Sequence, residues 1–217
     1  MDPLHLCIAL GPIGVYLLLM ATLNLSPRPF LTTGTRDTVA LAIAVCGLVM
    51  AGPMELFMPE AAAVYFRAWI WIPLITLYLL CATLAAMLMR PRLVIYNVTV
   101  EHLRPLLERV ASDLDDQRVW SGNSLRLPRL GIQLHLESFV PMRNVQLVAV
   151  GAEQDLAGWR ALETRLRQEL RDLVVGPNTM RGVSFLFFSL LIGFLVGTAM
   201  ISGSQQVAQA LHDFLRL

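Results

Sequence analysis

The sequence predicts a membrane protein with four transmembrane α-helices and an inserted α+β two-layer sandwich domain. Hydrophobic residues make up 56% of the 217 residues, against about 45–50% in soluble domains. They gather in four long apolar runs. Between the third run and the fourth, residues 90–181 show the shorter periodic patterns of strands and amphipathic helices.

Each apolar run is long enough to cross a bilayer. The runs cover residues 4–25, 39–58, 68–89 and 182–202. A hydrocarbon core of about 30 Å needs about 20 helical residues. The first run does not resemble a signal peptide, because Asp2 and His5 stand where a basic segment is expected. Pro12, Pro53 and Pro73 lie inside three of the runs and can kink a helix.

The placement of arginines predicts the orientation of the spans. The arginines that flank the spans on the side of the inserted domain are Arg28, Arg36, Arg90, Arg92 and Arg181. On the opposite side we place only Arg67 and Arg216. Cytoplasmic loops are enriched in basic residues. We therefore expect a multi-pass protein of the cell (inner or plasma) membrane, with residues 90–181 in the cytoplasm and both termini outside.

The inserted domain is expected to begin with a strand and a helix. Residues 92–96 are β-branched and aromatic, which is typical of a strand. Thr99 is a candidate N-cap for the next helix, and apolar residues recur at helical spacing over 103–114. The acidic segment around Asp115 is expected to be a solvated turn.

The rest of the domain predicts further strands and a second helix. Residues 118–128 suggest two short strands around a Ser-Gly-Asn-Ser turn, and residues 131–137 and 144–151 suggest further strands. An amphipathic helix follows Asp155. We summarise the order as β-α-β-β-β-α, which predicts an antiparallel sheet with both helices on one face.

Two segments near the C-terminus predict helix contacts. Ser189, Gly193 and Gly197 recur every four residues in the fourth run, and small residues at this spacing let another helix approach closely. The approaching helix belongs either to a partner or to this chain. Residues 203–217 predict an amphipathic helix that lies in the membrane interface, docks on a partner or packs back on the bundle.

No motif in the sequence indicates catalysis or metal binding. The four histidines and the three cysteines lack the spacings of metal or nucleophile motifs. We therefore predict no catalytic residue, no cofactor and no metal. Seventeen basic and sixteen acidic residues give a net charge of +1, which argues against a nucleic-acid partner.

Four polar residues remain candidates for a site. Glu55 lies near the end of the second run and Arg67 directly precedes the third, and an ionisable group at membrane depth is a functional candidate. His135 and Glu137 share one face of a predicted strand, as an acid–base pair requires. A surface pair of this kind is far more often incidental.

These patterns favour a non-catalytic anchor, scaffold or assembly subunit. Its partners would be the lipid bilayer and other membrane proteins, or a second copy bound through the fourth helix. The alternative is a transporter or membrane-enzyme component, or a ligand sensor, with a site near Glu55 and Arg67.

Overall fold

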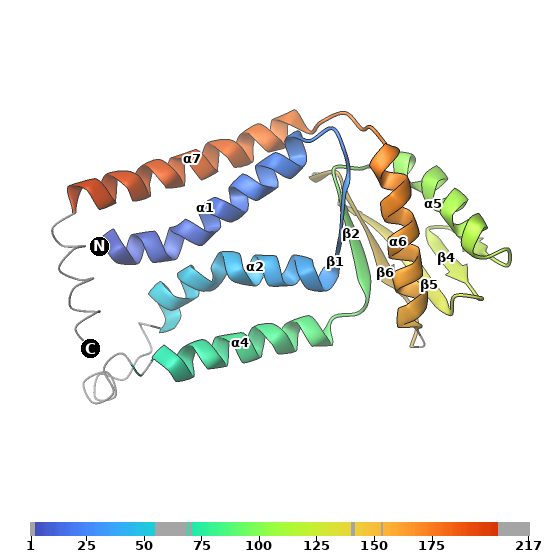
Figure 1. Cartoon of the computed structure of the whole chain (residues 1–217), viewed down its shortest axis with the longest axis horizontal. Coiled ribbons are helices and arrows are strands. Elements are labelled where there is room, and N and C mark those ends of the chain that lie inside the picture. Colours follow the sequence, from blue (N-terminus) through green and yellow to red (C-terminus); the bar gives the residue numbers. More distant parts are fainter. Residues whose placement is uncertain (1–2, 55–68, 70, 140–141, 153, 204–217) are drawn as a thin grey trace. The chain divides into compact units, whose positions relative to one another are not determined.

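The computed structural model describes residues 3–54, 69, 71–139, 142–152 and 154–203, and it divides the chain into two compact units. The helical unit consists of Met1–Met20, Thr38–Leu88 and Ser184–Leu217. The α+β unit consists of Ala21–Asp37 and Met89–Val183. Figure 1 shows both units and labels most of their helices and strands. The α+β unit therefore contains a segment that lies before the second apolar run in the sequence.

The prediction of four long apolar helices is confirmed. They are α1 (Pro3–Leu25), α2 (Gly34–Val49), α4 (Trp71–Leu88) and α7 (Thr179–Ser202). By length and composition each can cross a membrane. Helix α2 begins at Gly34, five residues earlier than expected, and passes into a π-helix, Met50–Met54, that contains Pro53. The expected tail helix lies outside the described residues, apart from Gly203.

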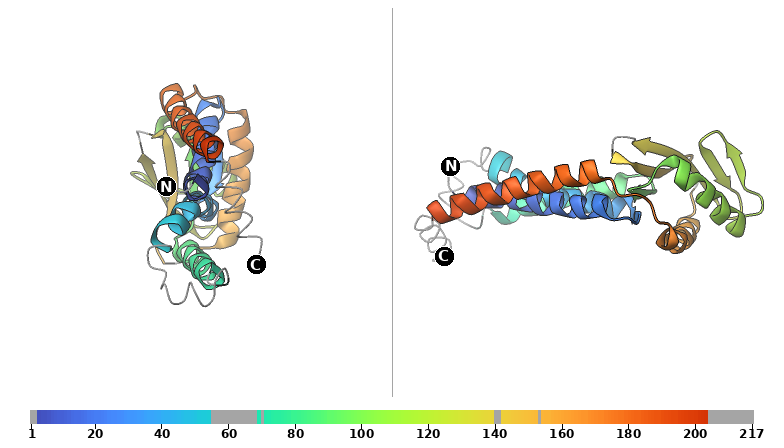
Figure 2. Two further views of the ribbon diagram at one scale, coloured as in Figure 1. Left: turned by 90° about the vertical axis from the view of Figure 1, so that its left-hand side faces the viewer. Right: turned by 90° about the horizontal axis from the view of Figure 1, so that it is seen from above.

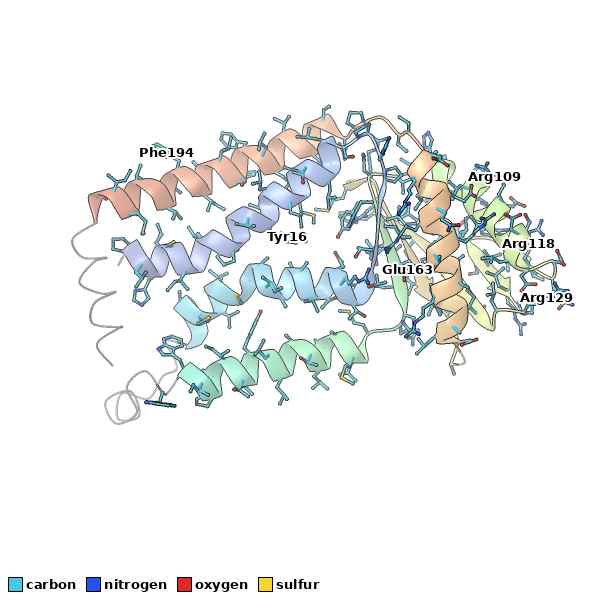
Figure 3. All side chains as sticks on the ribbon, in the orientation of Figure 1. Tyr16, Arg109, Arg118, Arg129, Glu163 and Phe194 are labelled. Carbon is cyan, nitrogen blue, oxygen red and sulfur yellow. The ribbon has the colours of Figure 1, made fainter. Side chains whose placement is uncertain are left out.

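Side-chain hydrogen bonds to backbone carbonyls join the helices of the helical unit in pairs. The Ser189 hydroxyl donates to the carbonyl of Gly14 at 2.9 Å, which links α7 to α1. The Tyr78 hydroxyl donates to the carbonyl of Ala42 at 2.6 Å, which links α4 to α2. Many large apolar side chains of these helices remain exposed, including Phe194 (Figure 3). Exposed apolar surface of this kind is typical of a membrane or protein contact.

One antiparallel sheet forms the framework of the α+β unit. Its strand order is β1-β2-β6-β5-β4-β3. The strands are β1 (Phe30–Thr33), β2 (Arg92–Tyr96), β3 (Val119–Ser121), β4 (Ser124–Leu127), β5 (Ile132–Phe139) and β6 (Asn144–Ala149). Leu31 lies opposite Ile95, and Leu93 lies opposite Leu147, so apolar side chains align across the sheet.

Two helices cover the apolar face of this sheet (Figure 2). Helix α5 (Val100–Leu114) buries Leu103 and Leu107, and helix α6 (Leu156–Asp172) buries Leu162 and Leu166. Alternate strand residues join them in one hydrophobic cluster, because successive side chains of a strand point to opposite faces. The apolar stripes predicted on both helices thus form the core of the unit.

The strands differ from the expected order in two respects. Four strands lie between α5 and α6, which agrees with the four strands predicted one by one over residues 118–151, whereas the summarised order β-α-β-β-β-α contains only three. The sixth strand, β1, comes from the connection between α1 and α2 and pairs with β2. The expected order contains no element in that connection.

The two ends of α5 also differ from expectation. Thr99 occupies the N-cap position, but its side chain makes no capping hydrogen bond and lies 2.8 Å from Nδ1 of His102. The Thr99 hydroxyl is the main cause of the lowered pKa of Glu101. Asp115, expected in a solvated turn, is only 1% exposed, because its carboxylate accepts two backbone N–H groups.

Candidate functional site

The candidate site is a basic cleft in the α+β unit, between the edge strand β1 and helix α6. We call it the arginine cleft, and its volume is about 310 Å³. Its lining residues are Arg28, Pro29, Phe30, Leu31, Thr32, Arg36, Arg167, Leu170 and Arg171. Pockets for small ligands start at about 300 Å³, so the cleft is large enough for a headgroup-sized molecule.

Two short segments bring the four arginines of the cleft together. Arg28 precedes β1, and Arg36 follows it in the first turn of α2. Arg167 and Arg171 stand four apart on α6 and so share one helix face. The sequence offered one signal for this arrangement, since residues 30–33 are apolar or β-branched and lie between Pro29 and Gly34.

The cleft has an excess of positive charge. Glu163 of α6 lies 2.6 Å from Nη2 of Arg167 and 4.0 Å from Nη1 of Arg36, and Figure 3 shows it on α6 beside β1. The side chains of Arg28 and Arg171 form no hydrogen bond or ion pair within the described part of the chain. Four arginines and one glutamate leave a local charge of +3 (4 − 1).

The edge of the sheet adds backbone donors to the cleft. β1 pairs with β2 on one side and is the last strand of the sheet on the other. An edge strand leaves every second N–H and C=O group without a strand partner. The side chain of Phe30 is 45% exposed, so this edge combines polar backbone groups with an apolar ring.

A network of backbone and asparagine contacts holds the segment before β1 in place. Val175 donates its N–H to the carbonyl of Pro27 at 2.8 Å, and Asn178 donates to that of Asn24 at 2.9 Å. The side chain of Asn97, which has a φ of 56° and is 1% exposed, donates to the carbonyl of Ser26. These contacts explain how a short segment distant in sequence becomes part of the sheet, and sequence reasoning did not identify them.

The structure groups the five membrane-flanking arginines only in part. Arg28 and Arg36 meet at the cleft, whereas Arg90 and Arg181 are exposed and do not line it. The aliphatic part of Arg92 packs against Gly34, where a Cβ would lie 2.2 Å from its Cγ. Nη1 of Arg92 is 3.4 Å from Oε1 of Gln146, while its buried Nε has no partner among the described residues.

The polar candidates do not form a catalytic arrangement in the described part of the chain. His135 and Glu137 both lie on the face of β5 opposite the core. Nδ1 of His135 is 2.9 Å from the Ser124 hydroxyl on β4. Glu55 and Arg67 lie outside the described residues. Across the described segments, no group of three or more His, Cys, Asp or Glu residues could hold a metal ion.

The small residues of α7 have two different environments. The Ser189 hydroxyl binds the chain's own helix α1. A Cβ added at Gly193 or Gly197 would meet no described atom within 4 Å. These two positions therefore have room for another helix.

A second hollow lies within the helical unit between α2 and α4. Its volume is about 290 Å³. Its lining is almost entirely apolar and includes Cys46 and Tyr78. The Tyr78 hydroxyl already donates to the carbonyl of Ala42. The lining of this hollow therefore provides few hydrogen-bond partners for a polar ligand.

Comparisons with family models, curated proteins and solved structures give no match to this chain.

Proposed function

We propose that this chain is an integral, multi-pass membrane protein that acts as a non-catalytic anchor, scaffold or assembly subunit. In this proposal the four apolar helices span the membrane, and the α+β unit is the module that they hold at the cytoplasmic surface. The observation that supports it best is the origin of β1 in the connection between α1 and α2.

The segment that contains β1 gives the module two further covalent attachments to the helices, in addition to those at its own two ends. The chain passes between the two units at four places, after Met20, Asp37, Leu88 and Val183. The connections are short: β1 continues into α2 with no residue between, and three residues, 89–91, separate α4 from β2. Short connections at several points restrict a module far more than one flexible linker does. Such an attachment is expected of a module that acts as an anchor or scaffold.

The apolar surface and the arginines support the membrane location and the orientation. The helices expose large apolar side chains along their length. Arg28, Arg36, Arg90, Arg92 and Arg181 all belong to the α+β unit or its connections. Their enrichment there favours the cytoplasmic side for the module.

The open face of α7 supports a protein partner in the membrane. Gly193 and Gly197 leave space that the described part of the chain does not fill. Small residues in membrane helices favour close helix contacts. We therefore assign this face to another membrane protein or to a second copy of the chain.

Native mass spectrometry of the protein, extracted gently from its own membranes, tests this proposal. We expect a defined complex with other polypeptides or a dimer. Gly193→Leu should dissociate it, because the new side chain occupies the open face. Gly11→Leu, in α1, is the matched control: a Cβ there also meets no described atom within 4 Å, so the complex should persist.

Two results would contradict the proposal. A monomer with a small bound molecule would support a sensor or transporter, especially if Glu55→Gln abolished the binding. A dissociation caused equally by Gly11→Leu and Gly193→Leu would show that the assembly does not depend on the open face of α7.

A further inference from the structure

We infer that the arginine cleft binds the phosphodiester headgroup of an anionic phospholipid. This inference rests on the proposed membrane location. It adds to that proposal a specific lipid ligand, which an anchor, scaffold or assembly subunit does not require.

The free arginines are the groups that would hold the phosphate. Arg28 and Arg171 approach the cleft from the connection before β1 and from α6, respectively, and neither has a side-chain partner in the described residues. Arginine binds phosphate oxygens through two parallel N–H groups. Arg36 and Arg167 share the single carboxylate of Glu163 and add further positive charge.

The remaining lining matches the rest of a phospholipid headgroup. Outward N–H groups of β1 can donate to phosphodiester or glycerol oxygens. The exposed ring of Phe30 supplies apolar contact beside the charged groups, and Leu31 and Leu170, which belong to the core, form the apolar base of the cleft. Inorganic phosphate has no apolar part that could contact this lining, whereas a phospholipid has both a polar and an apolar part.

The position of the arginines in the chain favours a membrane lipid over a soluble anion. Arg36 lies in the first turn of α2, and Arg28 follows the end of α1 by three residues. Both helices are apolar enough to cross a membrane. Residues this close to the ends of spans lie at headgroup level, where basic side chains are attracted to anionic lipids.

Lipid competition measured on the full-length chain tests this inference. The chain in detergent is mixed with equal amounts of phosphatidylglycerol and phosphatidylcholine of identical acyl chains, and native mass spectrometry gives the ratio bound. We expect the wild type to prefer phosphatidylglycerol. In Arg28→Gln/Arg171→Gln the preference should fall on the order of 30-fold, since each arginine near an anionic lipid contributes about a factor of five.

The matched control removes the same charge elsewhere in the module. Arg109 on α5 and Arg126 on β4 are exposed and do not line the cleft. Figure 3 labels Arg109 on α5 and Glu163 on α6. Arg109→Gln/Arg126→Gln should leave the preference unchanged. An equal loss in both double variants would show a general charge effect and overturn the inference.

Two further experiments distinguish a lipid ligand from a soluble anion, and a failure of this inference from a failure of the proposed function. Displacement of the lipid by inorganic phosphate, but not by chloride at equal ionic strength, would assign the cleft to a soluble anion. Equal binding of both lipids by the wild type would also overturn the inference. Extraction of the chain from membranes by alkaline carbonate would instead contradict the membrane proposal itself.

Discussion

At the scale of single residues, Asp115 shows how a buried carboxylate closes the end of helix α5. Oδ1 of Asp115 accepts the N–H of Gln117 at 2.8 Å, and Oδ2 accepts the N–H of Arg129 at 2.7 Å. Asp116, the next residue, has a side chain that is 78% exposed and pairs with Arg129 at 3.0 Å. The two neighbouring acids therefore have different roles despite their identical chemistry.

We expect Asp115→Ala to lower the free energy of unfolding of the module by about 3 kcal/mol, because two backbone N–H groups lose their acceptor in a buried setting. Asp116→Ala should change it by about 0.5 kcal/mol or less, since an exposed ion pair contributes little. Hydrogen exchange at the amides of Gln117 and Arg129 measures the difference directly. Equal exchange rates in the two variants would disprove the assigned role of Asp115.

At the scale of elements, the two helices of the module begin differently. Asp155 caps α6, and its side chain accepts the N–H of Ala157 at 2.8 Å. Thr99 caps α5 in position only, because its hydroxyl is turned toward His102 and Glu101. Both residue types are favoured at N-caps, so sequence alone does not distinguish the two ends.

Substitution of the two caps should therefore have unequal effects. Asp155→Ala should destabilise the module by about 1 kcal/mol, the usual value for a lost N-cap bond. Thr99→Ala should cost about 0.5 kcal/mol or less, as expected for an exposed residue without a capping bond. Two measurements compare the variants: the thermal unfolding of the solubilised chain, and hydrogen exchange of the amides in the first turns of α5 and α6. A larger loss for Thr99→Ala would refute the difference in capping.

At the scale of the whole molecule, local patterns predict most elements but not the strand that connects the units. The apolar runs predict the four long helices, and helical spacing predicts the buried stripes of α5 and α6. β1 is only four residues long and pairs with β2, far along the chain. A strand so short has no periodic signal of its own, and non-local pairing leaves no trace in local sequence.

The arginine cleft could not be predicted from the sequence for the same reason. The sequence predicts Arg28 and Arg36 as flanking residues of the spans, and Arg167 stands four residues after Glu163 on a helix. Their meeting depends on β1, which positions the first pair beside α6. A site formed by two distant segments cannot be found from the spacing within either one.

The contribution of β1 can be tested with the module alone. In residues 90–181 without β1, strand β2 becomes an edge, and its residues Leu93–Tyr96 are buried in the intact sheet. An apolar unpaired edge promotes association between copies. We therefore expect this segment to aggregate and to exchange the β2 amides rapidly.

Addition of residues 24–36 after residue 181, through a linker of about six glycine and serine residues that reaches about 13 Å, should reverse both effects. The linker can be short because Asn178 already donates to Asn24, and Val175 to Pro27. The same addition carrying Leu31→Asp is the matched control, since Leu31 is 8% exposed and part of the core. A charge there cannot be buried without a partner, so this version should aggregate like the bare segment. Light scattering and hydrogen exchange compare the three. If the bare segment is monomeric and as well protected as the extended one, β1 does not complete the sheet, and the proposed attachment of the module through β1 loses its support.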